Sequence, residues 1–266
     1  MKNKSVYISI DFEEWFHIPF LKPYVNKENS SISYCDKLDS FFDDLEKRNI
    51  KTTVFVVSEI ANKYSSALAS LANKGNVIGA HSTSHKCYKY FSNEDFLEDA
   101  LNAKKEIEKY TGVEVKGFRA PMFSASYEQI QLLSTIGYTF DSSSINSNLN
   151  PFYNRIKSKR WKNESKIREY EIPTLLQQPI AGGGHFRATP LWIYKNKIRV
   201  YLKSHDSLVF FIHPYEIYNK PFPGFKHGKK DYGWHRYNAG LKTVMKKFWK
   251  LIDWMQKKGF EFKTME

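Results

Sequence analysis

Two histidines, His81 and His85, follow an apolar run over residues 77–80. A short apolar run of this kind predicts a buried strand, which would place both histidines at its carboxyl end. Imidazole is a common ligand of divalent metals, and two histidines at this spacing can reach one ion. Polar turns without a metal show the same pattern, so the spacing alone leaves both interpretations open.

Other polar residues stand at the ends of predicted strands in the same way. They are Asp11, Glu13 and Glu14 after the predicted strand 5–10, Arg119 after 115–118, Asp141 within 138–144, and His213 after 207–212. In a parallel α/β fold the carboxyl ends of the strands meet at one edge, where barrel active sites are built. Each residue alone has an ordinary structural explanation, such as a loop cap or a surface ion pair. Their coincidence at one edge favours a functional site.

These residue types fit one reaction class. A catalytic zinc ion takes three protein ligands from His and Asp/Glu and keeps one position open. His81, His85 and one carboxylate of the segment DFEE meet that count. A further carboxylate is then available as a general base, another histidine as a general acid, and an arginine can hold the base ionised. The set predicts a metal-assisted hydrolase.

The elements that must position these residues alternate along the chain. Predicted strands cover residues 5–10, 51–57, 77–80, 115–118, 138–144 and 207–213, and predicted helices cover residues 35–50, 64–73, 92–112, 126–137, 191–202 and a C-terminal stretch from 239. Strands that alternate with helices indicate βα units and parallel strands. A length of 266 residues suits one α/β barrel, and no repeat or linker divides it. We therefore expect a single domain over residues 1–266.

The order of motifs resembles the polysaccharide deacetylases with a NodB-type domain, carbohydrate esterase family four. The matching motifs are IDFEE, HSTSH, FRAP and FFIHP, from Ser5 to His213. DFEEWF, GFRAPMFS, DSSS, AGGGHFR and HPYEI more narrowly resemble the branch found in bacterial exopolysaccharide and surface-glycan gene clusters. The resemblance implies a distorted (β/α) barrel with about seven parallel strands. It also implies removal of N-acetyl groups from an amino sugar.

The resemblance assigns roles to five residues of this chain. Asp11 would be the general base and His213 the general acid. His81 and His85 would bind a divalent metal, for which zinc is the expected ion. Arg119 would orient Asp11.

Two positions depart from the family pattern. The first motif usually holds two adjacent aspartates, whereas here Asp11 is followed by Phe, Glu13 and Glu14. The spacing resembles members with an Asp-x-Asp pattern, so we expect Glu13 to be the third ligand. On a strand-like path Asp11 and Glu13 also share a side, with Glu14 on the other. Asp141 stands where the family has a carboxylate that pairs with the late histidine, here His213, although the following residues differ.

The motif AGGGHFR has two interpretations. Three glycines permit unusual backbone angles and the close approach of a ligand, but no Lys-Ser/Thr follows, so it is not a P-loop. It is either a tight structural turn or a loop at the sugar site with Phe186 or Arg187 reaching the substrate. Aromatic residues that could stack on a sugar, or simply pack in the core, are Trp15, Phe16, Phe123 and Trp234.

Net charge and cysteine content bound the partners and the compartment. The formal charge is +13, concentrated over residues 155–168, 220–230 and 241–260, which fits either a solvated surface or an anionic partner such as a membrane. No nucleic-acid motif accompanies it, so we expect no nucleic-acid binding. Two cysteines are too few for a disulfide framework. The first apolar stretch ends at Asp11, which makes it too short for the core of a signal peptide. No apolar run is long enough for a membrane helix. We expect a cytoplasmic protein, with contact to the inner membrane face if the substrate is lipid-linked. Its oligomeric state stays open.

Competing functions remain at this point. The same fold could serve an allantoinase-like amidohydrolase acting on a small cyclic amide. An inactive glycan-binding homologue is the alternative outside enzymes, and it predicts damage to the catalytic set. That set is complete apart from the first-motif variation.

Overall fold

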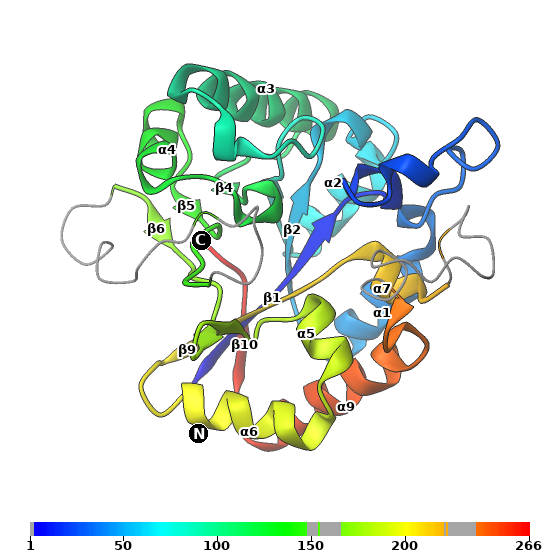
Figure 1. Ribbon diagram of the computed structural model, residues 1–266, viewed down its shortest axis with the longest axis vertical. Coiled ribbons are helices and arrows are strands. Elements are labelled where there is room, and N and C mark those ends of the chain that lie inside the picture. Colours follow the sequence, from blue (N-terminus) through cyan, green and yellow to red (C-terminus); the bar gives the residue numbers. More distant parts are fainter. Residues whose placement is uncertain (1–2, 148–153, 155–165, 221, 223–237) are drawn as a thin grey trace.

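A parallel β-sheet forms the centre of the fold, with helices around it (Figure 1). The computed structural model describes residues 3–147, 154, 166–220, 222 and 238–266. Within these ranges the main sheet has eight strands, β1 (Ser5–Phe12), β2 (Thr53–Val56), β3 (Val77–Ala80), β4 (Gly117–Phe118), β5 (Phe140–Asp141), β6 (Arg168–Glu169), β9 (Ser207–Ile212) and β10 (Glu261–Lys263). A separate hairpin joins β7 (Thr174–Leu175) to β8 (Gln178–Pro179).

Helices follow most of the strands. The α-helices are α1 (Asp39–Lys47), α2 (Ser65–Asn73), α3 (Asn93–Thr111), α4 (Tyr127–Leu132), α5 (Gly183–Ala188), α6 (Leu191–Tyr201), α7 (Pro214–Tyr218) and α9 (Val244–Lys257). Short 3₁₀ turns lie at Trp15–His17, Lys22–Tyr24, Cys35–Lys37, Ser58–Ile60, Tyr88–Tyr90, Pro121–Phe123, Leu133–Ile136 and Leu241–Thr243. In the described ranges, no helix combines the length and hydropathy of a membrane span.

β1 is the central strand of the sheet. One of its edges pairs with β9 over Ser5–Ile10, while the other pairs with β10 near the start and with β2 over Ser9–Phe12. From β2 the sheet continues in chain order through β3, β4 and β5 to β6, and every pair is parallel. The described residues also form two isolated parallel bridges, one between Ile145 and Ile172 and one between Gly182 and Phe211 of β9. The predicted α/β barrel of the NodB type is confirmed.

Side chains of β1 alternate between two cores. Val6, Ile8, Ile10 and Phe12 join the large cluster that packs against the helices. Tyr7 belongs to a second cluster inside the barrel, together with Phe55 of β2 and Phe140 of β5. Because the side-chain period of a strand is two, Ser9 and Asp11 face the same interior as Tyr7. The pattern of the strand thus carries Asp11 to the inside of the barrel at its carboxyl end.

Local signals explain the longest helix, α3. Ser92 is its N-cap, and its hydroxyl accepts a hydrogen bond from the backbone N–H of Asp95. Gly112 ends the helix in the left-handed region at φ 68°. Both ends agree with the prediction. The last helix differs: it begins at Val244, after a 3₁₀ turn, and not at Ala239.

Candidate active site and metal site

Three buried side chains form a candidate metal site at the carboxyl edge of the sheet. Glu13, His81 and His85 each offer a ligand atom, and these atoms lie within 4.8 Å of one another. Oε2 of Glu13 is 2.7 Å from Nε2 of His85. Within the described residues, the same Glu13 oxygen is buried without a hydrogen-bond partner. A buried carboxylate oxygen that faces imidazoles in this way fits a cation between them.

Backbone contacts hold the two histidines. The N–H of His81 continues the ladder from β3 to Val56, and Nδ1 of His81 lies 2.7 Å from the carbonyl oxygen of Arg119. A hydrogen bond from Nδ1–H to this carbonyl leaves Nε2 free for a metal, which is the usual arrangement around ligating histidines. Ser82 and His85 adopt left-handed backbone angles of φ 68° and φ 56°. The hydroxyl of Ser82 accepts the N–H of His85 and closes this turn.

Asp99 of α3 supports the turn between the histidines. Its carboxylate accepts hydrogen bonds from the backbone N–H and the hydroxyl of Thr83 and, at 2.5 Å, from the hydroxyl of Tyr88. Thr83 of HSTSH therefore has a structural role, since it ties the strained turn to a helix.

The two adjacent glutamates of the first motif point in different directions. Glu13 turns to His85, whereas the carboxylate of Glu14 accepts hydrogen bonds from the backbone N–H of Tyr34 at 2.8 Å and the hydroxyl of Tyr64 at 2.9 Å. The hydroxyl of Ser33 donates a further bond to Glu14. In this geometry Glu13, and not Glu14, takes part in the candidate metal site.

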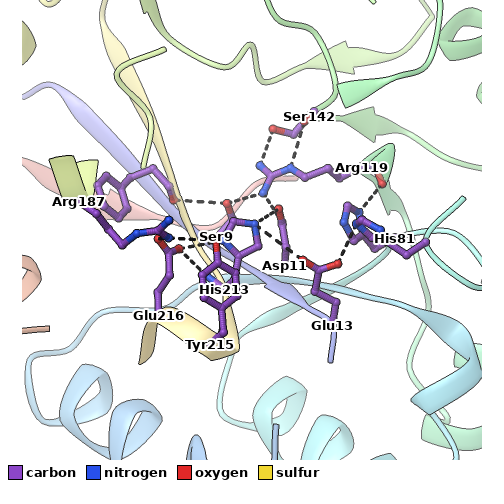
Figure 2. Close-up of polar contacts among 12 residues, drawn as sticks. Ser9, Asp11, Glu13, His81, Arg119, Ser142, Arg187, His213, Tyr215 and Glu216 are labelled. Atoms are coloured by element: carbon purple, nitrogen blue, oxygen red, sulfur yellow. Dashed lines mark hydrogen bonds and ion pairs between the residues drawn. The ribbon is translucent and has the colours of Figure 1, made fainter. Parts of the chain in front are cut away.

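Arg119 holds Asp11 from inside the barrel (Figure 2). Its Nη1 donates to Oδ1 of Asp11 at 2.6 Å and to the hydroxyl of Ser9 at 2.8 Å. Its other nitrogens donate to the hydroxyl and the carbonyl oxygen of Ser142, and its guanidinium lies 4.3 Å from the ring centre of Phe55. Arg119 is fully buried, so this network fixes both its position and that of Asp11.

His213 faces Asp11 and Glu13 from the end of β9. Its Nε2 lies 3.7 Å from Oδ2 of Asp11 and 3.9 Å from Oε1 of Glu13. Its Nδ1 lies 2.8 Å from Oε2 of Glu216, and the backbone N–H of His213 donates to the same oxygen. Glu216 in turn forms an ion pair with Arg187 (Figure 2).

Burial and neighbouring charges shift the protonation of these groups. Burial would raise the pKa of Asp11 and Glu13, but the neighbouring charges together outweigh it and lower both values, that of Glu13 to about 2. The strongest of these neighbours is Arg119 for Asp11 and His85 for Glu13. Burial lowers the pKa of His81 to about 4. Both carboxylates are therefore ionised and His81 is neutral near pH 7, which are the forms that bind metals and accept protons.

Asp141 is hydrogen-bonded to residues other than His213, its expected partner. Its carboxylate accepts hydrogen bonds from the backbone N–H and the hydroxyl of Ser143, and it is hydrogen-bonded to Glu169 on the neighbouring strand. The resemblance implies that Asp141 pairs with His213. In the structure this pairing is absent among the described contacts, because Nδ1 of His213 is hydrogen-bonded to Glu216 instead. The reason is local: His213 caps a helix whose third residue is Glu216, while Asp141 is engaged by the serines that follow it.

A cavity of about 580 Å³ opens onto Asp11, Glu13, His81, His85 and His213. Its wall is largely apolar, and Phe20, Met122, Phe123 and Phe211 line it together with the glycines of AGGGHFR. Volumes of this order are typical of small-ligand sites. Of the aromatic residues considered for sugar stacking, Phe123 lines the cavity, Trp15 is buried with its indole N–H on Ile32, and Trp234 lies outside the described residues.

The two side chains of AGGGHFR that were considered for substrate contact differ. Phe186 packs in the core against Tyr194 and Phe210, so the expectation that it reaches substrate is wrong. Arg187 lines the cavity but directs its guanidinium to Glu216. Gly182 has φ 135°, and a Cβ there would lie 2.0 Å from the carbonyl oxygen of Phe211, so only glycine fits beside β9.

Comparisons with known proteins found matches for two segments of the chain. Residues 34–141 match the sequence model of the family described as polysaccharide deacetylase. This segment of the chain is thus similar to polysaccharide deacetylases. Residues 143–266 match a second model, described as a domain of unknown function (DUF3473). A curated relative, the peptidoglycan-N-acetylglucosamine deacetylase of Bacillus cereus, is 27% identical over 124 residues, which are 45% of this chain and 45% of that protein.

Solved structures of polysaccharide deacetylases share the fold. The chain superposes on a putative polysaccharide deacetylase from Mycobacterium smegmatis with a TM-score of 0.66 and 14% identity, covering 99% of this chain and 88% of that one. A CE4 family pseudoenzyme from Bacillus anthracis is also similar, with a TM-score of 0.52, 12% identity, and coverage of 99% and 64%. At these identities the likeness concerns the fold alone. The side chains of the site must carry the argument for function.

Sequence reasoning missed Glu216 and gave Arg187 a different role. The signal for Glu216 was present in the motif HPYE, because a residue before proline often caps a helix and a glutamate three positions later completes the capping box. That pattern predicts that the glutamate folds back onto His213. The partnership with Arg187 joins distant segments and has no local signal.

Proposed function

We propose that this chain is a metal-dependent N-deacetylase, a hydrolase that removes the acetyl group from an amino sugar of a bacterial surface polysaccharide or its lipid-linked precursor. One observation carries the proposal. The carboxylate of Asp11 and Nε2 of His213 approach to 3.7 Å beside the metal-ligating set Glu13, His81 and His85, in a cavity that admits a ligand. A base, an acid and a cation site thus converge where an amide could bind.

The residues of this chain divide the proton transfers of amide hydrolysis between them. Asp11, kept ionised by Arg119, accepts a proton from water as the water oxygen bonds to the acetyl carbon. His213 donates the proton on Nε2 to the sugar nitrogen as the carbon–nitrogen bond breaks and its electron pair passes to nitrogen. The products are acetate and a free amino sugar.

Glu13, His81 and His85 would hold the metal ion. Two imidazoles and one carboxylate form a ligand set that zinc takes in hydrolases, with a coordination position left for substrate or water. A divalent ion held there supplies Lewis acidity, which polarises the acetyl carbonyl and favours loss of a proton from water.

The cavity and the similarity to polysaccharide deacetylases support the proposed substrate class. The apolar wall of the cavity suits the acetyl methyl group and the face of a sugar ring, and Phe123 and Phe211 are available for stacking. We also propose that residues 1–266 act as one catalytic domain. β1 supplies Asp11, and its partners β2 and β9 come from the segments matched by the two different family models.

Two other functions use the same fold. An amidohydrolase acting on a small cyclic amide would need the same base, acid and metal. An inactive homologue would lack part of the set, whereas here the base, the acid and the metal-ligand candidates are all present and converge; they are Asp11, His213, Glu13, His81 and His85. Incubation of the purified protein with N-acetylated chitooligosaccharides and, separately, with a cyclic ureide distinguishes the three. We expect acetate and free amine from the sugar; turnover of the ureide alone, or of neither, would contradict the proposal.

Contact with an anionic membrane is part of the proposal for a lipid-linked substrate at the inner, cytoplasmic face. Helix α9 buries Val244, Phe248, Leu251 and Met255 and exposes Lys242, Lys246, Lys250 and Lys257 near or along its outer side. Helix α6 adds Arg199 and Lys195. Burial, followed by the charges of Arg199, Lys250 and Lys257, lowers the pKa of Lys195. A cationic surface of this kind attracts anionic lipid. The free thiols of Cys35 and Cys87 suit a reducing compartment.

A further inference from the structure

Side chains of two distant motifs meet behind the candidate acid: Tyr215 and Glu216 come from HPYEI, and Arg187 comes from AGGGHFR. Nδ1 of His213 lies 2.8 Å from Oε2 of Glu216, the other oxygen of Glu216 pairs with Nη1 of Arg187, and Arg187 also donates to the hydroxyl of Tyr215 at 3.0 Å (Figure 2). The Nε of Arg187 donates to the carbonyl oxygen of Ala239. The contacts therefore run from the backbone of Ala239 through Arg187 and Glu216 to the ring that faces Asp11.

This ion pair is deeply buried. Arg187 is 5% exposed and Glu216 is 1% exposed. Burial of two charges costs several kcal/mol per ion before their attraction is counted, and a pair of apolar side chains often stabilises a protein as well. Helix α7, only five residues long, needs no buried arginine to be capped. The arrangement thus calls for an explanation beyond stability.

Contacts with Tyr215 and Glu216 fix the orientation of the His213 ring. The ring of His213 stacks on Tyr215, with centroids 5.1 Å apart and planes 24° apart. Glu216 contacts both the backbone N–H and the ring of His213, so the imidazole has one orientation, with Nε2 directed to Asp11 and Glu13. Gly182 lets the AGGGHFR segment approach β9, which brings Arg187 within reach of Glu216.

We propose that Glu216, held by Arg187, is the positioning residue that keeps His213 ready to protonate the leaving amine. The inference rests on the proposed function. Glu216 accepts the Nδ1 proton of His213, so that the proton transferred to the sugar nitrogen comes from Nε2, and its negative charge stabilises the imidazolium before that transfer. In this chain Glu216 therefore does what the resemblance assigned to Asp141.

The variant Glu216→Gln tests this role with little change in shape. Because it removes the negative charge that faces the buried guanidinium of Arg187, the double variant Glu216→Gln with Arg187→Gln is tested beside it. The surface variant Glu46→Gln, which breaks the exposed ion pair with Lys74, is the matched control. Circular dichroism, thermal unfolding and metal content establish that each protein is folded and loaded.

Two substrates separate acid catalysis from general damage. An N-acetylated chitooligosaccharide has a basic amine leaving group that needs a proton, whereas p-nitrophenyl acetate releases a stable phenolate that does not. We expect kcat on the amide to fall by about 10²-fold in the single and double variants, with KM unchanged within about twofold in the single variant. The ester rate should stay within about threefold of the unsubstituted protein, and the Glu46 variant should behave like it on both.

Two results would overturn the inference. A folded, metal-loaded double variant that cleaves the amide at the unsubstituted rate shows that Glu216 is dispensable. An equal loss on amide and ester shows a structural role. If the unsubstituted protein cleaves no N-acetyl sugar, the proposed function fails, and ¹⁵N NMR of His213 then decides the positioning separately. A protonated Nδ1 that changes its signal in Glu216→Gln but not in Glu46→Gln supports the geometry, and an unchanged signal rejects it.

Discussion

Oε2 of Glu13 lies 2.7 Å from Nε2 of His85, while the next residue, Glu14, directs its carboxylate to Tyr34 and Tyr64. Adjacent glutamates therefore serve different purposes. Since β1 ends at Phe12, Glu13 continues the side of the strand that faces the barrel, and Glu14 turns to the loop around Ser33.

Substitution of these two glutamates should have opposite consequences. Glu13→Gln should reduce bound zinc well below one ion per chain with little loss of stability. Glu14→Gln should retain zinc but lower the free energy of unfolding by about 1–3 kcal/mol, because hydrogen bonds from three buried donors are weakened. Elemental analysis and urea unfolding measure the two effects. A Glu14 variant that loses the metal while Glu13→Gln keeps it would reassign the ligand.

Asp11→Asn should leave the metal in place and remove most of the turnover. The amide can still lie beside Arg119 but cannot accept a proton from water, so we expect a loss of about 10²–10⁴-fold in kcat. Metal content and acetate release on the same sample test this. Retention of more than a tenth of the activity would show that another group is the base.

The buried pair Asp141 and Glu169 makes stability depend on pH. Burial raises the pKa of Asp141 to about 6, and burial with the charge of Asp141 raises that of Glu169. A carboxyl whose pKa is raised in the folded state stabilises the fold below its unfolded pKa of about 4. This contribution is lost as pH rises, through about 6 for Asp141 and at higher pH for Glu169.

Glu169→Gln removes one carboxyl from this pair. From pH 5 to pH 7 the variant should gain on the order of 1 kcal/mol in unfolding free energy relative to the unsubstituted protein. Urea unfolding of chelator-treated samples measures the difference at each pH, with Glu46→Gln as the control for an exposed glutamate. Parallel pH profiles of the unfolding free energy for all three proteins would show that this pair does not make stability depend on pH.

The lysines of α9 should govern any binding to anionic membranes. We expect salt-sensitive cosedimentation with anionic liposomes, and each lysine near the leaflet contributes about 1 kcal/mol, within a Debye length of about 8 Å at physiological salt. Lys250→Gln with Lys257→Gln should weaken it, whereas Lys105→Gln with Lys109→Gln, on α3 at the opposite end of the molecule in Figure 1, should not. Activity on a short soluble sugar should be the same in both. Absence of binding at any salt would leave the lysines as a solvated surface.

Local patterns predicted much of this molecule. Alternation along residues 5–10 placed Asp11 inside the barrel, and the apolar run before His81 gave β3. The helix α3 and a C-terminal helix were also predicted, since helical periodicity is a property of short segments. The proposed roles of Asp11, Glu13 and His213 remain predictions, now with a geometry that suits them.

Long-range contacts account for what was not predicted. Nothing local shows that β9 and β10 both pair with β1, or that Arg187 meets Glu216. The expected pairing of Asp141 with His213 was wrong because it was transferred by position in a motif. In this chain a capping glutamate three residues away is closer to the ring than any carboxylate on β5.

The central claim is that Glu13, His81 and His85 hold a metal on which deacetylation depends. The most direct measurement is acetate release from an N-acetylated chitooligosaccharide by purified protein, by protein stripped with a chelator, and by stripped protein with zinc restored, with His81→Ala in parallel. We predict activity in the first and third samples, and activity reduced by at least about 10²-fold in the stripped protein and in the His81 variant. Equal acetate release in all four samples would contradict the account.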